Sequence, residues 1–600
     1  PYDYNTAPQT MEIMNLIGAA MSHRMTMEGK AGVVKNAIFD LFTPARAFQI
    51  YRGTARILTE TASANFARKR TLKPSDLQSR RGGTGTYNPD QVSWNFPMPW
   101  KGGDWTFRTM VEYQHSAAMA ALNMAAGNRA EFNMAQYSAI KWAMDREDTP
   151  YAFVFPAEQP DPSSTARLLQ AMQRGEVEVH RANRSFTADG RAFDAGSHVI
   201  LLRQPYGAWA KTLLEVQEYP DLRRSSDDPP VVPYDVTAQT LPLMMGVEAV
   251  QIADEFDANL RLVSDEVVFA GDVSGDGAGG FVIMPGSNEA YAVADRLLDD
   301  GMQVSRISDT DGNSMYPPGS FHVSPANGLR GKLQDLAKTW HFRAVGLPAA
   351  PEGMTMTRLH NPRIGLYEPW GGVMDAGWTR RMLEQWALEF KTLRHTDISG
   401  NLRDQYDIIL LPEGISADRL MNGSDNWPDE YKGGIGPEGK AALTTFIRSG
   451  GTVVAFGRTS MALVETLDLP VSNTLDGLES TEYFEPGSLV ITHLDRSNPL
   501  AYGLPEKLPV MNRRGPAFEP KPTTQKGPEM AARYPDYDPR ISGFLLGEKH
   551  LRGRGAIAIQ PLGAGRAILF SMNPQFRAMT HGSYKLVFNA IFWAARGAAL

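Results

Sequence analysis

Two segments of the chain repeat the same order of elements. Residues 151–182 contain an apolar strand, a Pro-rich loop, a helix, a glycine and a second strand, and residues 280–307 follow the same order. Each copy is followed by a similar tail, FDAGSHVILL in the first and YPPGSFHVSP in the second. A repeat of this length corresponds to one supersecondary unit. We therefore expect two related β-α-β modules with parallel strands and right-handed crossovers.

Glycines close the helices of both repeats. Gly175 and Gly301 follow the last helical residues of the two copies. Because a residue just beyond a helix often adopts a left-handed backbone, we expect positive φ at both positions.

Residues 359–600 carry a different pattern. Strands that are apolar throughout, such as YDIILLPEG and TVVAFGRTS, alternate with amphipathic helices. Strands of this kind are typical of a parallel sheet covered by helices on both faces. We therefore expect an α/β protein with a doubly wound, flavodoxin-like C-terminal domain at residues 359–600. The repeats fall in modules at residues 148–240 and 241–358, and residues 1–147 form the first domain.

The composition excludes several classes of function. The chain has 60 basic and 67 acidic residues, a net charge of −7, and no long basic run, so we expect no nucleic-acid partner. It has no cysteine, which excludes disulfides, thiolate zinc ligands and a cysteine nucleophile. It contains no apolar run of the roughly 18 residues that a membrane-spanning helix needs. We therefore expect a protein that is not transmembrane.

The eleven histidines do not form a local metal motif. None of them is followed by Glu or His after three or four positions, so the HxxE, HxxH and HExxH spacings are missing. We therefore assign no metal ligand to this chain.

Glu60 ends an apolar segment, ARILTE, that is expected to be a strand. A carboxylate in such a position is costly to bury unless it is paired or lies at a cleft, where it can act as a general base. The alternative is a structural ion pair with Arg52, Arg56 or Arg68.

ARILTETASA, with Tyr51 before it and PMPWKGGDWTFRTMVEYQ after it, resembles the C-terminal part of the catalytic domain of the zinc carboxypeptidases. GEVEVHRA, VPYDVTAQTLPLMMGV and TWHFRAVGL extend the resemblance to the large bacterial members of that family. The resemblance implies a zinc-dependent exopeptidase that cleaves peptide or protein substrates in the periplasm or outside the cell. No signal peptide is visible in the chain itself.

The same resemblance implies a general-base role for Glu60. Tyr51 is a weaker candidate for the cleft, because its spacing does not match the mobile tyrosine of the family. The zinc ligands of the family would all precede Pro1, so zinc would be held by an upstream segment or chain. Residues 1–600 alone are then expected to be inactive, because unactivated water has a pKa near 15.7.

Residues 362–600 resemble the class I glutamine amidotransferase-like fold, in which a turn after a buried strand carries a nucleophilic Cys. This chain has Gly457, Arg458, Thr459 and Ser460 at that turn. Hydrolysis there would need Thr459 or Ser460 activated by a base such as His581. We favour a binding or packing domain that lacks the nucleophile.

The segment EPWGGVMDAGW contains a second candidate site. It places Trp370, Gly371 and Gly372 on a loop between a strand and a helix, where doubly wound sheets bind ligands. The alternative is that these residues pack a domain interface.

Two functions therefore remain open. The first is the C-terminal portion of a zinc metallocarboxypeptidase-like exopeptidase with Glu60 as its base. The second is a non-catalytic periplasmic or extracellular binding or scaffold protein derived from such an enzyme.

Overall fold

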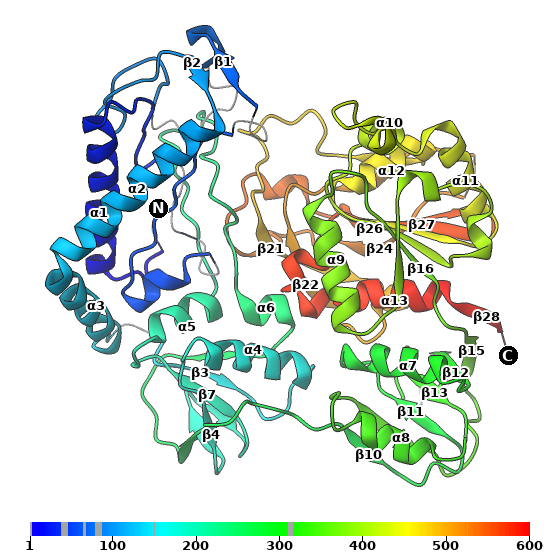
Figure 1. The fold of residues 1–600 in the computed structure, drawn as a ribbon. Helices are drawn as coiled ribbons and strands as arrows, with labels where there is room; N and C mark the ends of the chain where they lie inside the picture. The colour runs from blue at the N-terminus through cyan, green and yellow to red at the C-terminus, as the bar shows by residue number, and fades with distance from the viewer. Residues whose placement is uncertain are drawn as a thin grey trace.

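The computed structural model describes residues 3–37, 42, 46–63, 68–77, 87–147, 150–309, 316–524 and 526–599. The molecule is a mixed α/β protein with several separate sheets. In Figure 1 the N-terminal helices lie on the left, the largest sheet lies at the upper right, and the two modules lie below.

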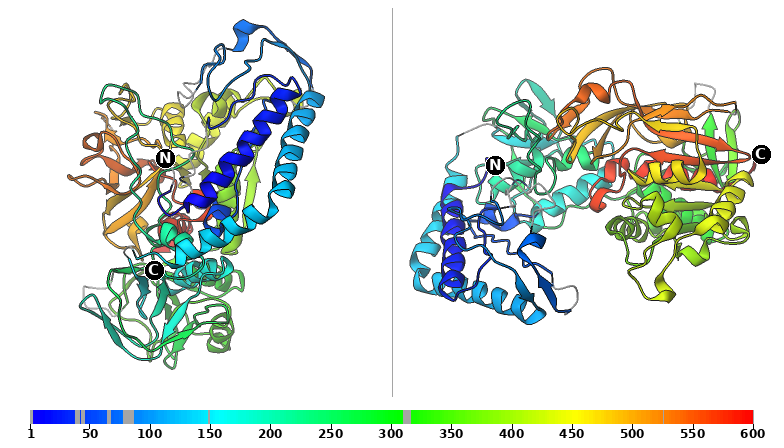
Figure 2. Two further views of the ribbon diagram at one scale, coloured as in Figure 1. Left: turned by 90° about the vertical axis from the view of Figure 1, so that its left-hand side faces the viewer. Right: turned by 90° about the horizontal axis from the view of Figure 1, so that it is seen from above.

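Long helices dominate residues 1–147. Helices α1 (Pro8–Met27) and α2 (Phe107–Gly127) run side by side, and α3 (Arg129–Met144) packs across the end of α1 (Figure 2). A short antiparallel pair, β1 (Arg70–Leu72) and β2 (Gly103–Trp105), lies beyond them. The alanine- and methionine-rich stretch before residue 147 thus forms two helices.

The internal repeat is present in the structure. In the first module the strand order is β8-β3-β7-β4-β9, and the second module has the equivalent order β14-β11-β13-β12-β15. The helices that follow β3 and β11 also correspond to each other.

The main elements of the first module are β3 (Ala152–Phe155), α4 (Pro162–Arg174), β4 (His180–Ala182), β7 (His198–Leu201), α5 (Gly207–Leu214), α6 (Leu241–Met245), β8 (Val250–Ile252) and β9 (Leu260–Leu262). Those of the second are β11 (Phe281–Ile283), α7 (Glu289–Asp299), β12 (Val304–Asp309), β13 (Phe321–Val323), α8 (Leu329–Leu336), β14 (Arg343–Gly346) and β15 (Thr355–Leu359).

The two strands of each β-α-β unit run in the same direction, as expected. They are not neighbours, because the tail strand lies between them and is antiparallel to both. The expectation for Gly175 was wrong, since its φ is −82°. The ring of Trp209 lies 1.9 Å from where a Cβ of Gly175 would be, so the glycine permits close packing. Gly301 has the expected positive φ of 75°.

The sheets do not end where the sequence suggested. Strands β8 and β9 pair with β3 and β4, so the first sheet extends past the expected boundary at residue 240. The second sheet also includes β10 (Asp272–Ser274) and β28 (Arg596–Ala599), which pairs with β15. The end of the chain therefore lies beside the second module (Figure 1).

A large sheet fills residues 364–570. Its first five strands are parallel, in the order β17-β16-β18-β19-β27, which corresponds to the order 2-1-3-4-5 of doubly wound sheets. These strands are β16 (Ile364–Tyr367), β17 (Phe390–Leu393), β18 (Ile408–Leu411), β19 (Thr452–Ala455) and β27 (Gly565–Phe570).

Helices cover both faces of these parallel strands. Successive side chains of a strand point to opposite faces. Ile408 and Leu410 accordingly pack into the core with α13, while Ile409 and Leu411 pack into the core with α11 and α12. This explains why the sequence of β18 is apolar throughout. The helices are α9 (Met374–Gln385), α10 (Ala417–Asn422), α11 (Gly436–Arg448), α12 (Thr459–Leu467) and α13 (Tyr584–Ala594).

Antiparallel strands continue the sheet. Beyond β27 follow β26 (Gly555–Leu562), β24 (Glu529–Arg533), β21 (Ser488–Leu494) and β22 (Lys507–Asn512). Because each is antiparallel to the one before, β22 again runs in the direction of β27. A Cβ on Gly515 would lie 1.9 Å from the carbonyl oxygen of Ser571, so the segments that follow β22 and β27 touch. The sheet therefore curls and brings these two carboxyl ends together.

No helix in the described part of the chain is both long enough and apolar enough to cross a membrane.

Candidate functional site

Glu60 lies on the wall of a cavity of about 610 Å³. The lining comes from α1, from residues 31–37 and 56–63, and from α2, and it is mostly apolar. Residues 56–63 belong to no helix or strand, so the predicted strand before Glu60 is absent. They are held instead by side chains: the indole Nε1 of Trp105 donates to the carbonyl oxygen of Ala62 at 2.8 Å, and Gln114 is bonded to Thr61.

The carboxylate of Glu60 is exposed. It accepts a long hydrogen bond from the hydroxyl of Tyr234, at 3.5 Å. Arg52 binds Glu176 and the carbonyl oxygen of Gly175, and the Arg56 guanidinium donates to backbone carbonyls. Within the described ranges no ion pair joins Glu60 to an arginine. The structural ion pair considered as its alternative role is therefore not formed.

Tyr51 does not share this cavity. It lies in the 3-10 helix η1 (Phe48–Arg52), is only 4% exposed, and packs in a core cluster with Met14 and Phe153. Burial raises the pKa of its hydroxyl well above the usual value, and the nearby Asp3 carboxylate raises it further. The candidate cleft residue is thus a packing residue.

The loop that follows β16 carries Trp370, Gly371 and Gly372. Two side chains pack on the Trp370 indole: the Tyr431 ring lies 4.7 Å away edge-on, and the Arg394 guanidinium lies 4.3 Å from its centre. Arg419 donates to the carbonyl oxygens of Trp370 at 3.2 Å and Gly372 at 2.9 Å. The packing of Trp370 therefore stabilises the loop.

Glycine is needed at the next position of this loop. Gly371 has a φ of +83°, and a Cβ there would lie 2.6 Å from the Trp427 ring. These residues stand at the carboxyl edge of the sheet, as expected for a ligand site, but they do not line the cavity near Glu60.

Two carboxyl groups meet at the same edge of the sheet and were not singled out from the sequence. Asp375 accepts a hydrogen bond from the side-chain amide of Asn573, which follows β27. Glu413, which follows β18, accepts from the backbone N–H of Arg458 at 2.6 Å and from its Nε at 2.7 Å. Burial raises the pKa of both carboxyls, while the neighbouring cations lower them. The sequence signal for Glu413 was its position just after the apolar strand β18, whereas Asp375 lies in the first turn of α9.

The turn after β19 has no available nucleophile. The Ser460 hydroxyl is fully buried and lies within hydrogen-bond distance of the carbonyl oxygens of Ala455 at 3.0 Å and Phe570 at 2.8 Å. The Thr459 hydroxyl is also buried and lies 2.9 Å from the carbonyl oxygen of Pro412. Both side chains tie the turn to neighbouring strands.

His581 cannot serve as their base in this arrangement. It is buried against the rings of Trp386 and Tyr584. Burial lowers the pKa of its imidazole to about 3, and the Arg167 cation lowers it as well. Its side chain belongs to the core around α13.

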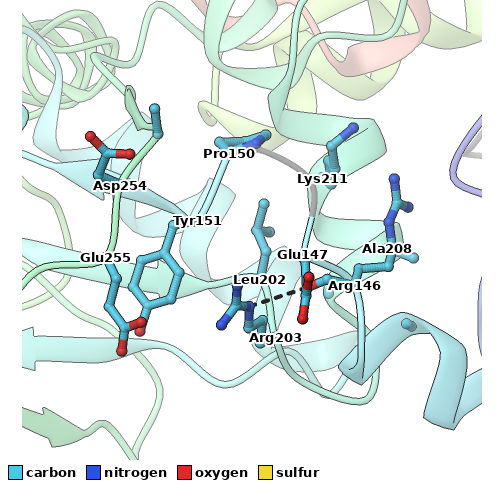
Figure 3. A pocket seen from close by; sticks show the side chains of 13 residues that line it. Arg146, Glu147, Pro150, Tyr151, Leu202, Arg203, Ala208, Lys211, Asp254 and Glu255 are labelled. Carbon is cyan, nitrogen blue, oxygen red and sulfur yellow. Dashed lines mark hydrogen bonds between the residues drawn. The ribbon is translucent and has the colours of Figure 1, made fainter.

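A second, smaller cavity of about 210 Å³ lies between α3, α5 and the first module (Figure 3). Figure 3 shows Arg146, Arg203 and Lys211 on one side and Asp254 and Glu255 on the other. Arg203 donates to the carbonyl oxygen of Arg146 at 3.1 Å, and Lys211 is paired with Glu215 at 2.8 Å. The hydrogen bond from Arg203 therefore joins the first module to the residue that follows the N-terminal helices.

No group of three or more His, Cys, Asp or Glu side chains in the described residues could hold a metal ion. Among the described residues, those that line the cavity with Glu60 include Thr, Gln, Tyr, Arg and Lys side chains and no histidine.

No protein-family model and no curated protein match the chain. Among solved structures, an exo-β-1,4-mannosidase from Opitutaceae bacterium strain TAV5 is 9% identical over 40% of this chain and 36% of that one, with a TM-score of 0.24. A β-galactosidase from Bacillus circulans is 11% identical over 38% of this chain and 31% of that one, with a TM-score of 0.25. The chain thus spans about a third of the length of these two proteins. A ThuA-like protein from Bacteroides uniformis is 11% identical over 42% of this chain and 95% of that one, with a TM-score of 0.26.

Proposed function

We propose that this chain is the C-terminal portion of an exopeptidase of the zinc carboxypeptidase type, with Glu60 as general base. The observation that supports the proposal is the placement of Glu60 on the wall of a cavity of about 610 Å³ without an arginine partner among the described residues. A general base must reach solvent or substrate and must be free to accept a proton. The exposure of the Glu60 carboxylate supports the first of these conditions.

The described residues do not fit a zinc site, because they include no suitable set of ligands. Under this proposal the ligands belong to a segment or chain outside the present sequence. The contribution of this chain is then limited to the carboxylate that accepts a proton and to the walls that surround the substrate. The proposal includes a periplasmic or extracellular location and a peptide or protein substrate, as the family resemblance implies.

The C-terminal half has a supporting role in this proposal. The strand order of its parallel sheet supports a flavodoxin-like, glutamine amidotransferase-like domain. Because the turn after β19 offers only buried hydroxyls, we assign this domain to binding or positioning.

The proposal predicts that Glu60→Gln abolishes peptide hydrolysis. In the full natural protein we expect the rate of release of C-terminal residues from a peptide mixture to fall by about 100-fold or more, because the amide cannot take the proton. Zinc content, measured by elemental analysis, should not change. The matched control is Glu131→Gln, which alters an exposed carboxylate on α3 and should leave hydrolysis unchanged.

Hydrolysis by Glu60→Gln at the wild-type rate would refute the role of Glu60. A full natural protein with neither zinc nor peptidase activity would favour the alternative, a non-catalytic binding or scaffold protein.

A further inference from the structure

The carboxyl edge of the large sheet collects arginines from distant parts of the chain. Arg458 follows β19, Arg513 and Arg514 follow β22, and Arg577 lies shortly after β27. These three strands run in the same direction, and the curl of the sheet brings the ends of β22 and β27 into contact. We call Arg458, Arg513, Arg514 and Arg577 the arginine cluster.

One carboxylate is shared by three guanidinium groups. The almost fully buried side chain of Asp235 pairs with Arg513 at 3.3 Å, with Arg577, and with Arg46 at 3.4 Å. A single negative charge faces three positive charges, so the group keeps a net positive charge. Each guanidinium carries five N–H donors, and Asp235 uses only a few of them.

Arg514 adds a further cation, on which the charge of the Glu485 carboxylate acts without a direct ion pair. Its side chain makes no hydrogen bond or ion pair with any residue that the structure describes, although its backbone N–H is held by Glu485 at 2.6 Å. Burial lowers the pKa of its guanidinium, and the like charges of Arg513 and Arg458 lower it further. Like charges held this close repel one another, and an added anion would relieve that repulsion.

The backbone is strained where this cluster forms. Arg514 and Arg577 have φ values of 55° and 49°, in the left-handed region that residues with a side chain rarely adopt. Strain of this kind is retained where the surroundings hold it in place, and it concentrates at ligand sites. It fixes the direction in which the two guanidinium groups leave the chain.

We infer that the arginine cluster is a binding site for a small dianion with a phosphate or dicarboxylate group. Planar guanidinium groups bind such oxyanions through paired N–H donors. The N-terminus of α12 does not supply the anion site. The backbone N–H of Arg458, at the start of that helix, already donates to the Glu413 carboxylate. This assignment is independent of the proposed peptidase activity.

A neighbouring buried acceptor adds a second requirement for the ligand. Asn573 is 8% exposed, its amide nitrogen donates to Asp375, and its Oδ1 has no partner among the described residues. The charges of Arg458, Arg513 and Arg577 lower the pKa of the Asp375 carboxyl. Because Asn573 is hydrogen-bonded to Asp375, it adjoins the arginine cluster. A ligand that also carries a hydroxyl group could satisfy this oxygen.

Calorimetric titration with inorganic phosphate and with succinate tests the inference. We expect saturable binding of at least one of them at low ionic strength, weakened by added salt as for any exposed charge contact. Arg514→Gln should weaken that binding about tenfold, the loss expected for one charge-assisted contact. The control is Arg496→Gln, which removes an exposed arginine that follows β21, beside the amino end of β22 and not its carboxyl end, and which should bind like the wild type.

Each outcome bears on the inference. Tighter binding of phosphate would assign a phosphate-bearing ligand, and tighter binding of succinate would assign a dicarboxylate. Thermal unfolding should confirm that Arg514→Gln is folded and should show that the anion no longer raises its Tm as much as that of the wild type. Absence of saturable binding of both anions, or equal binding by wild type and Arg514→Gln, would overturn the inference.

Discussion

Trp386→Ala should destabilise the protein by about 3–5 kcal/mol, the range for removing a large buried aromatic side chain. Trp386 closes α9 and has no exposed surface. The rings of His581, Tyr584 and Phe588 pack around it, with centroids 5.3, 5.1 and 6.0 Å away. The Arg167 guanidinium of the first module lies 5.0 Å from its ring. The substitution therefore removes contacts inside the C-terminal domain and at its junction with the first module.

Trp378→Ala is the matched control for this prediction. Trp378 lies on the same helix but is 38% exposed, so its loss should change the free energy of unfolding much less. Urea unfolding followed by far-ultraviolet circular dichroism compares the two variants. Equal destabilisation of Trp386→Ala and Trp378→Ala would show that Trp386 does not organise this core.

The sequence could predict the large sheet because its strands are buried on both faces. A strand such as β18 must then be apolar at every position, and that pattern is visible without a structure. The repeat likewise predicted two matching modules. It could not predict that the tail strand inserts between the other two, because an apolar pattern does not record which strands are neighbours in the sheet.

Candidate sites were harder to predict because a local sequence pattern does not show which distant residues pack against a side chain. Glu60 could be proposed because it ends a local apolar segment, and the structure does place it at a cavity. Tyr51 and Ser460 have similar local contexts, yet both are buried, since burial depends on distant partners. The arginine cluster shows the converse: its members come from separate strands and converge only when the sheet curls. The local signal was the position of Arg458, Arg513 and Arg514 directly after apolar strands.

Asp407→Asn should lower stability by about 3 kcal/mol near neutral pH, because it leaves the guanidinium groups of Arg363 and Arg403 without the buried carboxylate that they share. Asp407 stands at the amino end of β18, opposite the arginine cluster, and its side chain is fully buried. It pairs with Arg363 at 2.8 Å, with Arg403, and with His360 at 3.0 Å. The expected loss of stability lies at the low end of the range for breaking a buried ion pair, because the two arginines are partly exposed.

The effect of Asp407→Asn should depend on pH. Burial alone would raise the pKa of the Asp407 carboxyl, but hydrogen bonds from His360, Arg363 and Arg403 outweigh burial and hold it well below its usual range. A carboxyl with a depressed folded-state pKa stabilises the fold above its unfolded pKa of about 4, and that contribution is lost as the pH falls below it. The difference in unfolding free energy between wild type and Asp407→Asn should therefore be largest above about pH 5 and shrink toward pH 3.

Asp404→Asn, which changes an exposed carboxylate nearby, should show no such gap in unfolding free energy. A gap for Asp407→Asn that stays constant from pH 7 to about pH 3 would mean that the ionised carboxylate is not what joins β16 to β18.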